Sequence, residues 1–256
     1  MIRAYEKQDY QAVVTLWKEA FGDSEEDIKA CMFHFAPFLS LYTEDAALLG
    51  MFMRLPLYAG TKKGEYIYAV ATAKTAQGRG IATKLLDEAK ADVVNRKLDF
   101  LVLVPAKPSL FEFYEKRSFI KGALVTKCSY THQEGKKVNV AVKRITAQEM
   151  YTKRNTYFNK FAAWDTQILT AIDEIYGGCF YELEDKGFCL AYPSADKVIV
   201  SELCLNGIEK ETALEALCVY FGKEKIEAVI PDVNGEAFAM FYPAEAAELY
   251  FNIAIN

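Results

Sequence analysis

Short apolar runs alternate with amphipathic stretches along the chain. A β-rich run over residues 66–72 leads into a glycine-containing loop, and helical spacing of apolar positions then predicts a helix over residues 81–95. The apolar positions of this helix are Ile81, Leu85, Leu86 and Ala89. The continuous apolar run over residues 100–104 is typical of a strand buried on both faces of a sheet. This order predicts a fold of the broad α/β class. Because the sheet is expected to be mixed, the arrangement is of the α+β kind.

The second half of the chain shows the same order of elements. Residues 187–192 and 198–205 are expected to form paired strands joined by a Pro-Ser-Ala-Asp turn. A helix over residues 209–221 and a strand over residues 226–231 follow. The first residues of each half also agree, since Gln8-Asp9 and Gln148-Glu149 both follow a short strand and begin a helix. Two related units are one interpretation, and a generic α+β appendage is the other.

A polar, turn-rich stretch over residues 131–137 connects the two halves. It fits a domain linker, and it fits equally the tip of a hairpin between residues 125–130 and 138–142. In the second case the halves share a sheet or exchange a strand. We place the boundary near residue 135, which gives domains 1–135 and 136–256.

Composition and charge exclude several classes of protein. Of the 256 residues, 52% are hydrophobic and 25% charged, which is ordinary for a globular protein. No apolar stretch reaches transmembrane length and the N-terminus has no signal-peptide core, so we expect a cytoplasmic protein without membrane contact. A net charge of −5 without a basic run argues against nucleic acid as a partner.

The six cysteines favour neither a metal site nor a redox motif. None forms a Cys-x-x-Cys pair, and they lie among apolar neighbours, as buried free thiols do. A catalytic cysteine requires a nearby histidine, but nothing in the sequence ties His34 or His132 to a thiol. We therefore expect no metal.

The loop before the first predicted helix carries the clearest chemistry. Gly78 and Gly80 let the backbone approach a ligand closely, and the helix that follows offers unpaired N–H groups and a positive dipole end. Arg79 and Lys84 add positive charge. These features predict a phosphate cradle. A turn or a helix cap built on two glycines is the alternative.

The spacing in this loop is that of neither a P-loop nor a dinucleotide-binding turn. Gln77-x-x-Gly80-x-Ala82 resembles the pyrophosphate loop of the GNAT acyltransferase superfamily, Gln/Arg-x-x-Gly-x-Gly/Ala. Residues 109–119 resemble the family's Phe-Tyr-Glu-Lys-x-Gly-Phe segment. The resemblance covers roughly residues 1–130. It implies a GNAT fold with a central twisted mixed sheet flanked by helices, followed here by a second, degenerate GNAT-like unit.

The resemblance implies acetyl-CoA as co-substrate and places its contacts. Pantetheine is expected to pair with backbone groups of Val70 and Thr72. The diphosphate is expected to bind the loop before the helix predicted over residues 81–95 and the first turn of that helix. The residues concerned are Gln77, Gly78, Arg79, Gly80, Ile81, Ala82 and Thr83. In the second half, Glu209 and Glu211 occupy the matching helix start, where they repel a pyrophosphate.

Two side chains are candidates for acid–base chemistry. Tyr114 matches the family's frequent general acid, which protonates the leaving thiolate, although a packing tyrosine among phenylalanines gives the same pattern. Glu65 is the candidate general base, and an exposed turn glutamate is the alternative. Deprotonation through water, or no dedicated base, also stays open. Two residues depart from the family pattern, Lys107 in place of Asn and Ser118 in place of Gly.

We therefore expect an acetyl-CoA-dependent N-acetyltransferase, in which the primary amine of a small molecule or peptide attacks the thioester directly. The region over residues 21–41, acidic and then aromatic, fits either a cationic amine or an ordinary helix start and core stripe. The alternative function is a non-catalytic acyl-CoA-binding or interaction protein on a GNAT scaffold. The sequence is compatible with a monomer or a homodimer.

Overall fold

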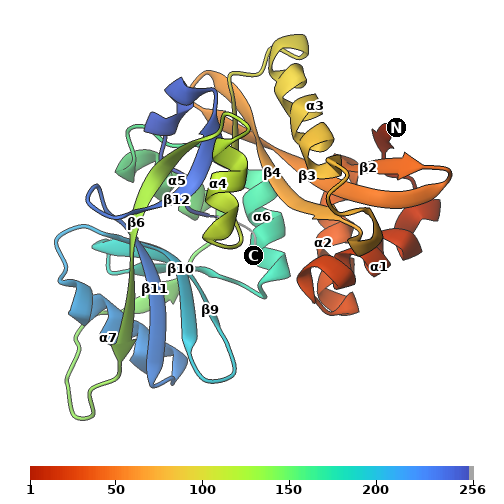
Figure 1. The fold of residues 1–256 in the computed structure, drawn as a ribbon. Coiled ribbons are helices and arrows are strands. Elements are labelled where there is room, and N and C mark those ends of the chain that lie inside the picture. Colours follow the sequence, from red (N-terminus) through yellow and green to blue (C-terminus); the bar gives the residue numbers. More distant parts are fainter. Residues whose placement is uncertain (254–256) are drawn as a thin grey trace. The chain divides into compact units, whose positions relative to one another are not determined.

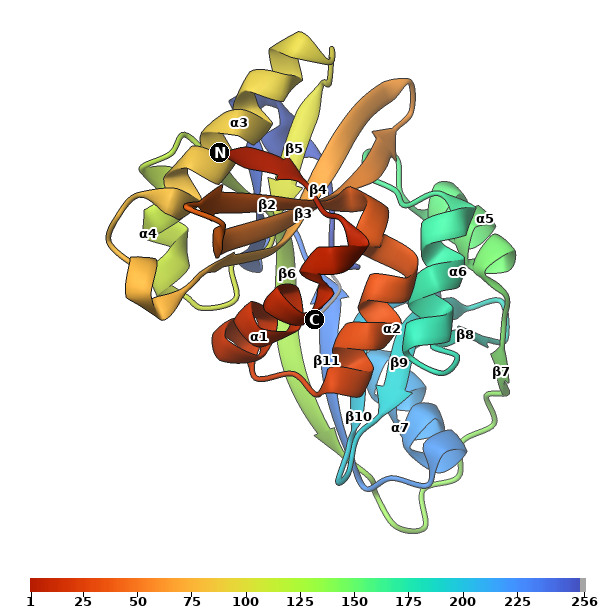
Figure 2. The same ribbon diagram turned by 90° about the vertical axis from the view of Figure 1, so that its right-hand side faces the viewer.

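The computed structural model describes residues 1–253 of the chain (Figure 1, Figure 2). These residues form two compact units. Unit 1 consists of Met1–Lys121 together with Ala239–Glu248. Unit 2 consists of Gly122–Phe238 together with the segment that begins at Leu249. A stretch from the C-terminal part of the chain thus completes unit 1.

Unit 1 contains a mixed sheet in the order β1-β2-β3-β4-β5-β12. Its strands are β1 (Ile2–Ala4), β2 (Leu39–Glu44), β3 (Ala47–Ala59), β4 (Lys62–Thr72), β5 (Phe100–Leu103) and β12 (Glu236–Tyr242), of which the part from Ala239 belongs to this unit. Its helices are α1 (Tyr10–Phe21), α2 (Glu25–Phe35), α3 (Ile81–Asn95) and α4 (Ser109–Glu115). Only β4 and β5 are parallel neighbours, and α3 connects them. In Figure 2, α3 lies on the opposite side of strands β2 to β4 from α1 and α2.

Unit 2 contains a second mixed sheet in the order β7-β8-β9-β10-β11-β6. Its strands are β6 (Ile120–Thr131), which begins at the end of unit 1, β7 (Val142–Arg144), β8 (Phe180–Leu183), β9 (Gly187–Pro193), β10 (Val198–Leu205) and β11 (Lys225–Pro231). Its helices are α5 (Ala147–Tyr157), α6 (Thr166–Ile175) and α7 (Lys210–Phe221). Again one pair is parallel, β10 with β11, and α7 connects the two strands.

The two sheets repeat the same pattern of pairing. In each, four strands follow one another in antiparallel pairs, a helix leads to a parallel fifth strand, and a sixth strand pairs antiparallel with the fifth. Each fourth strand also carries an irregularity in its pairing with the third, opposite Phe52 in unit 1 and at Ser201 in unit 2. This correspondence supports the prediction of two related units, while the domain limits 1–135 and 136–256 stay a prediction.

Of the two alternatives for residues 131–137, the hairpin between residues 125–130 and 138–142 does not form. β6 pairs with β11, and β7 pairs with β8. The residues between them form no regular pairing in the described part of the chain, and Gly135 adopts a positive φ of 81° there. The polar stretch is therefore a connection rather than a hairpin tip.

Apolar faces of α3 and α7 form the two described cores. Ile81, Leu85, Leu86 and Ala89 of α3 are all at most 2% exposed and pack on strands of unit 1, which confirms the predicted helix. In unit 2, Leu214 and Leu217 of α7 pack on β10 and β11 in the same way. Burial of this apolar surface is what holds each helix to its sheet.

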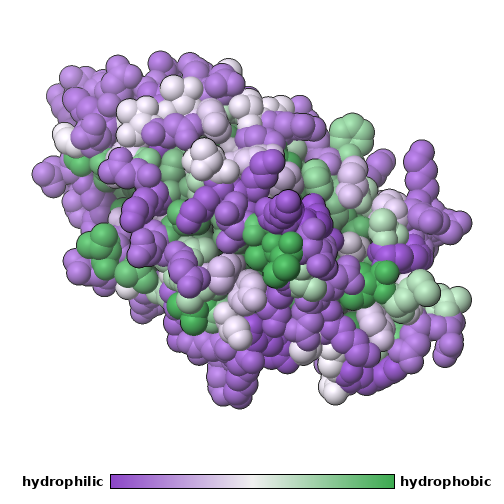
Figure 3. Space-filling view, turned by 90° about the horizontal axis from the view of Figure 1, so that it is seen from above, coloured by the Kyte–Doolittle hydropathy of each residue, from purple (hydrophilic) through white to green (hydrophobic). Residues whose placement is uncertain are grey.

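The remaining surface and the thiols agree with a globular protein. The face drawn in Figure 3 is mostly hydrophilic, with hydrophobic residues in separate small patches. Within residues 1–253, no helix combines the length and the apolar character needed to cross a membrane. All six cysteines are free thiols, and all but the half-buried Cys128 are buried, which confirms their predicted character.

Candidate active site

The site begins where β4 separates from β5. The two strands pair in register only as far as Ile67 with Leu103, and β4 then continues to Thr72. Ala69 has a φ of +50°, and the bulge at this point shifts the pairing of β4 with β3. Among the described residues, backbone groups of β4 beyond Ile67 therefore have no strand partner on the β5 side, so the two strands splay apart there.

Beyond β4, the loop leads into an uncapped helix N-terminus. Gly80 is the N-cap of α3 with a φ of +75°, and no side chain caps the helix. The first backbone bond of this end is donated by the N–H of Lys84 to the carbonyl of Gly80, at 3.0 Å. The N–H groups of Ile81, Ala82 and Thr83 precede it, so they lack an acceptor within the helix. This arrangement suits an anionic ligand.

The two glycines of the loop keep the approach to this helix end open. Gly78 has a φ of +78°, and a Cβ built on Gly78 or Gly80 meets no atom within 4 Å. Glycine is favoured here by backbone conformation, since the left-handed region penalises other residues. Gly50 on β3 has the opposite role: a Cβ there would lie 2.6 Å from Ile81 Cγ2. The absence of that side chain lets the start of α3 pack close to the sheet.

The two basic residues at the loop already have side-chain partners. Arg79 forms an ion pair with Glu44 at 2.8 Å, and both side chains are more than 40% exposed. Lys84 donates a hydrogen bond to the Tyr42 hydroxyl at 3.0 Å. Because the Arg79 pair is exposed to solvent, it is weak and leaves the guanidinium able to exchange Glu44 for another anion.

Arg117 is a cation at this site that the sequence analysis did not single out. Its Nε and Nη2 donate to Oγ1 of Thr83 at 3.0 and 2.7 Å, and Nη1 donates to the carbonyl of Phe113 at 2.6 Å. The guanidinium also lies 3.5 Å from the Phe113 ring centroid. Its position three residues after Tyr114, on the turn that follows α4, is the only sequence signal that could have pointed to it.

Tyr114 lies within the core of unit 1. It is 7% exposed and shares a hydrophobic cluster with Ile67 and Leu103, the last paired residues before the splay. Burial raises the pKa of Tyr114 to about 12, although Arg117 acts to lower it. The phenol is therefore protonated at neutral pH, as a proton donor must be, and its edge contacts with Phe113 and Phe119 fit the packing interpretation equally well.

Glu65 lies at the other end of β4, seven residues before Thr72, or roughly 20 Å along an extended strand. Its carboxylate is 2.6 Å from Arg96 Nη1 and 3.8 Å from Arg54 Nε, and the residue is 5% exposed. The structure thus brings the loop residues and Thr72 together but keeps Glu65 apart from them. A general-base role for Glu65 stays a prediction.

The residues present fit coenzyme A at this site. Oγ1 of Thr72 is buried and has no hydrogen-bond partner among the described residues, so a polar atom at the end of β4 is left to be satisfied. The open glycine loop and the uncapped start of α3 lie directly after it in the chain. Val70 is half-buried against the same core. Within residues 1–253, no group of three or more His, Cys, Asp or Glu side chains could hold a metal ion.

The matching region of unit 2 has different chemistry. The pairing of β10 with β11 ends at Val200 with Ala228, and the Nδ2 of Asn252 donates to the carbonyl of Ser201 at 2.7 Å just beyond it. Glu209 is the N-cap of α7, and Glu211 lies in its first turn. The Asn252 side chain thus binds backbone of β10 where β10 and β11 separate. The carboxylates of Glu209 and Glu211 lie at the start of α7.

Comparison with known proteins identifies the class. Residues 1–120 match the family model described as an acetyltransferase (GNAT) domain. Over residues 1–120 the chain is therefore similar to a GNAT acetyltransferase domain, as the pyrophosphate-type loop and the Tyr114 segment indicated. No curated protein sequence matches the chain.

Solved structures share the fold over both units. A candidate acetyltransferase from Pyrococcus horikoshii has a TM-score of 0.67 at 17% identity, covering 100% of this chain and 94% of its own. A GCN5-related N-acetyltransferase from Kribbella flavida has a TM-score of 0.66 at 15% identity, with 94% and 70% covered. One from Anabaena variabilis has a TM-score of 0.67 at 12% identity, with 94% and 72% covered. At these identities the likeness establishes the GNAT fold alone.

Proposed function

We propose that unit 1 is an acetyl-CoA-dependent N-acetyltransferase acting on a primary amine of a small molecule or peptide. The observation that carries the proposal is the continuity of three features along one segment: the splayed end of β4, the open glycine loop and the uncapped start of α3. A thioester cofactor with a pantetheine arm and a diphosphate needs a strand edge followed by an anion site, in that order.

Binding rests mainly on backbone groups. Val70 and Thr72 offer free strand groups to the pantetheine amides, and the Thr72 hydroxyl gains the partner it lacks. The amides of Gln77 and Arg79 already donate to the carbonyls of Lys74 and Ala76. The amides of Gly78 and of Gly80 to Thr83 therefore hold the diphosphate, through hydrogen bonds to charged oxygens that are stronger than neutral ones. The cofactor supplies an activated acetyl thioester. Arg79 is free to leave Glu44 for a phosphate oxygen.

In the transfer itself, the neutral amine nitrogen attacks the carbonyl carbon, a C–N bond forms and the C–S bond breaks. The nitrogen loses one proton and the departing sulfur takes up one. We assign the donated proton to the hydroxyl of Tyr114, which is buried and protonated at neutral pH. We assign removal of the amine proton to water, because Glu65 is held by two arginines at the far end of β4.

The contacts of the Glu65 carboxylate with Arg54 and Arg96 also favour the second candidate function, a non-catalytic acyl-CoA-binding protein. Without a dedicated base, the scaffold can bind the thioester and leave it intact. The two functions agree on cofactor binding and differ in turnover, so they separate experimentally.

Calorimetric titration with acetyl-CoA tests the shared part. Gly80→Glu places a carboxylate at the anion site and is expected to weaken binding at least about a hundredfold. Gly60→Glu, at a glycine of positive φ in the β3–β4 turn, is the matched control and should bind as the wild type does. Equal affinity of wild type and Gly80→Glu contradicts the cradle.

A thiol-release assay with polyamines, aminoglycosides and amino acids tests the transfer. Release of free thiol that depends on the amine establishes an enzyme and ranks acceptor classes. Tight acetyl-CoA binding without release on any amine supports the non-catalytic alternative instead.

A further inference from the structure

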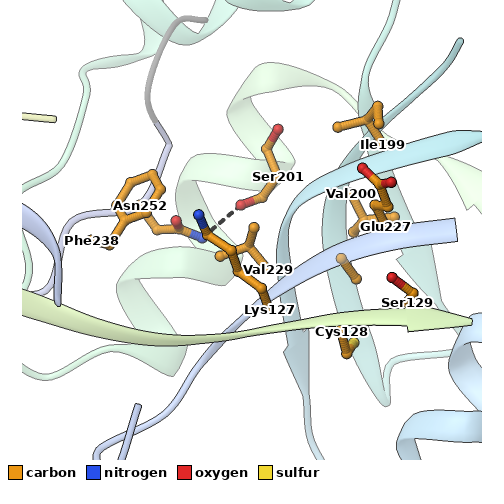
Figure 4. A pocket seen from close by; sticks show the side chains of 11 residues that line it. Lys127, Cys128, Ser129, Ile199, Val200, Ser201, Glu227, Val229, Phe238 and Asn252 are labelled. Carbon is orange, nitrogen blue, oxygen red and sulfur yellow. Dashed lines mark hydrogen bonds between the residues drawn. The ribbon is translucent and has the colours of Figure 1, made fainter. Parts of the chain in front are cut away.

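In unit 2, the strand edge that matches the proposed cofactor edge of unit 1 is occupied by the chain itself (Figure 4). β10 pairs with β11 as far as Val200 with Ala228, and the carbonyl of Ser201 follows directly. This carbonyl accepts a hydrogen bond of 2.7 Å from Nδ2 of Asn252. A side-chain amide therefore lies at the edge where unit 1 offers backbone groups of β4 to pantetheine.

The segment that carries Asn252 is fixed on both sides of this residue. The carbonyl of Tyr250 accepts a hydrogen bond from the N–H of Ala162 at 2.8 Å. The carbonyl of Ile253 accepts one from Nε1 of Trp164, also at 2.8 Å. Asn252 itself is 1% exposed. Its amide is thus held against β10 in one position, as a bound ligand would be.

The contact between Asn252 and Ser201 has the chemistry of an amide ligand on a strand. The asparagine side chain ends in the same kind of group as the amides of a pantetheine arm, with a carbonyl and N–H donors. Ser201 is 8% exposed, and a buried backbone carbonyl needs a donor. A ligand that displaced Asn252 would therefore have to supply an N–H group in its place.

A cavity of about 370 Å³ borders this contact (Figure 4). Its lining includes Val200, Ser201 and Ala228 of the splayed edge, together with Asn252 and Phe238. All of these residues belong to unit 2. Cavities of about 300 Å³ or more have the size of small-ligand sites, so the space beside Asn252 suits a short chain.

The start of α7, which follows β10, disfavours a phosphate on such a chain. Glu209 is the N-cap of α7, and Glu211 lies in its first turn. A hydrogen bond from its own backbone N–H lowers the pKa of the Glu211 carboxyl, which is therefore charged at neutral pH. The first N–H groups of α3 in unit 1, in contrast, lack an acceptor within their helix. A ligand of the unit 2 edge should therefore carry amides but no phosphate.

We propose that the splayed edge of unit 2 is a closed binding site for a phosphate-free amide chain of the pantetheine type, in which Asn252 takes the place of a ligand amide. The proposal rests on the proposed function for the way in which pantetheine meets a splayed strand. Asn252 closes the site by its bond to the Ser201 carbonyl, and the cavity beside it receives the chain once that amide is removed. Acetyl-CoA itself binds only in unit 1, because its diphosphate meets two carboxylates in unit 2.

Hydrogen-exchange mass spectrometry on full-length Asn252→Ala tests the proposal with two probes, pantetheine and 4′-phosphopantetheine. Pantetheine at about 10 mM should slow exchange in β10 about tenfold, which corresponds to a dissociation constant of about 1 mM. The phosphorylated probe should slow it less. In β4 of unit 1 the order should be reversed, because the start of α3 favours the phosphate. In the wild type, neither probe should slow exchange in β10.

Asn155→Ala is the matched control and should respond as the wild type does, because it removes an exposed amide that donates to the Tyr151 carbonyl at 2.9 Å. Circular dichroism reports folding, and Asn252→Ser decides if Asn252→Ala does not fold, since it frees the same carbonyl but keeps a polar side chain.

Three results overturn the proposal: pantetheine leaves exchange in β10 unchanged in both Asn252 variants, it slows exchange equally in the wild type, or the phosphorylated probe acts as strongly on β10. Slowing that is confined to β10 supports the site in unit 2 and contradicts the proposed function of unit 1. The two proposals therefore fail separately.

Discussion

Arg117 donates two hydrogen bonds to the Thr83 hydroxyl, at 2.7 and 3.0 Å, and thereby holds a guanidinium beside the first turn of α3. The ring of Phe113 lies against the same guanidinium. This turn has no side-chain cap, and its N–H groups are free. A fixed cation next to free amides strengthens an anion site, because the guanidinium does not have to be ordered when the ligand arrives.

Arg117→Gln should therefore weaken acetyl-CoA binding by about tenfold, the loss expected for one charge-assisted contact near a partly exposed site. The affinity should also become less sensitive to salt, since one cation no longer faces the phosphates. Titration calorimetry at two ionic strengths measures both effects. Lys116→Gln, one residue away and paired with the exposed Glu112, is the control that should bind as the wild type does. An unchanged dissociation constant for Arg117→Gln would place Arg117 outside the binding site.

Ser118 has a φ of +67°, a conformation that favours glycine. The family pattern has glycine here, so the departure noticed in the sequence corresponds to a strained backbone. Ser118→Gly should raise thermal stability by up to about 1 kcal/mol, the strain relieved less the greater freedom of glycine in the unfolded chain. Ser118→Val should lower stability, because a β-branched residue tolerates this region least. Calorimetric measurement of the melting temperatures of both variants tests this prediction. Melting temperatures that shift in the same direction in both variants would contradict backbone strain at Ser118.

Glu182 makes the stability of unit 2 depend on acid pH. Burial raises the pKa of this carboxyl, but hydrogen bonds from Lys143 and Lys153 outweigh it and lower the pKa from about 4.5 to about 2. A group whose pKa is lower in the folded state stabilises the fold above its unfolded pKa. That stabilisation is lost as the pH falls from about 4.5 through about 2.

Glu182→Gln should therefore melt several degrees below the wild type at neutral pH, and the gap should close in acid. Thermal unfolding followed by circular dichroism between about pH 7 and pH 3 measures it. Glu224→Gln is the control, because Glu224 is an exposed residue of unit 2. A gap that stays constant with pH would mean that the charge of Glu182 does not contribute.

Sequence patterns were sufficient for elements whose chemistry is local. The helix at Ile81 and the paired strands β9 and β10 follow from apolar periodicity and a turn, both readable within a few residues. Contacts distant in sequence were not readable in that way. The pairing of β12 with β5 joins Met240 to Leu103, and nothing in either strand specifies the other. Arg117 and Thr83 likewise meet only through tertiary packing, so neither signalled the other in the sequence.

Glu65 shows the same limit for a candidate catalytic residue. A glutamate on β4 fits the family pattern, yet only the fold shows that Arg96 and Arg54 bind it at the end of the strand away from the loop. The residue type and the strand can be predicted from the sequence. The distance of Glu65 along the strand from the place where the chemistry occurs cannot.

Tyr114→Phe separates proton donation from packing. If the hydroxyl protonates the leaving thiolate, its removal should lower kcat by about 10²- to 10⁴-fold while the affinity for acetyl-CoA stays the same, because phenylalanine fills the same space. Phe119→Leu, which changes a neighbouring ring contact without touching the hydroxyl, is the control and should affect thermal stability more than kcat. Full activity of Tyr114→Phe would assign Tyr114 to packing alone.

The pH profile adds an independent check on the same residue. Since burial raises the pKa of Tyr114 to about 12, its phenol keeps its proton throughout the range in which the fold can be assayed. A wild-type kcat that rises with pH as the amine loses its proton, and then stays level to about pH 10, agrees with this donor. A fall in kcat between about pH 8 and pH 10 that is absent in Tyr114→Phe would instead mean that the phenol titrates near its ordinary pKa of about 10. In that case the Tyr114 hydroxyl is solvated where the cofactor meets it.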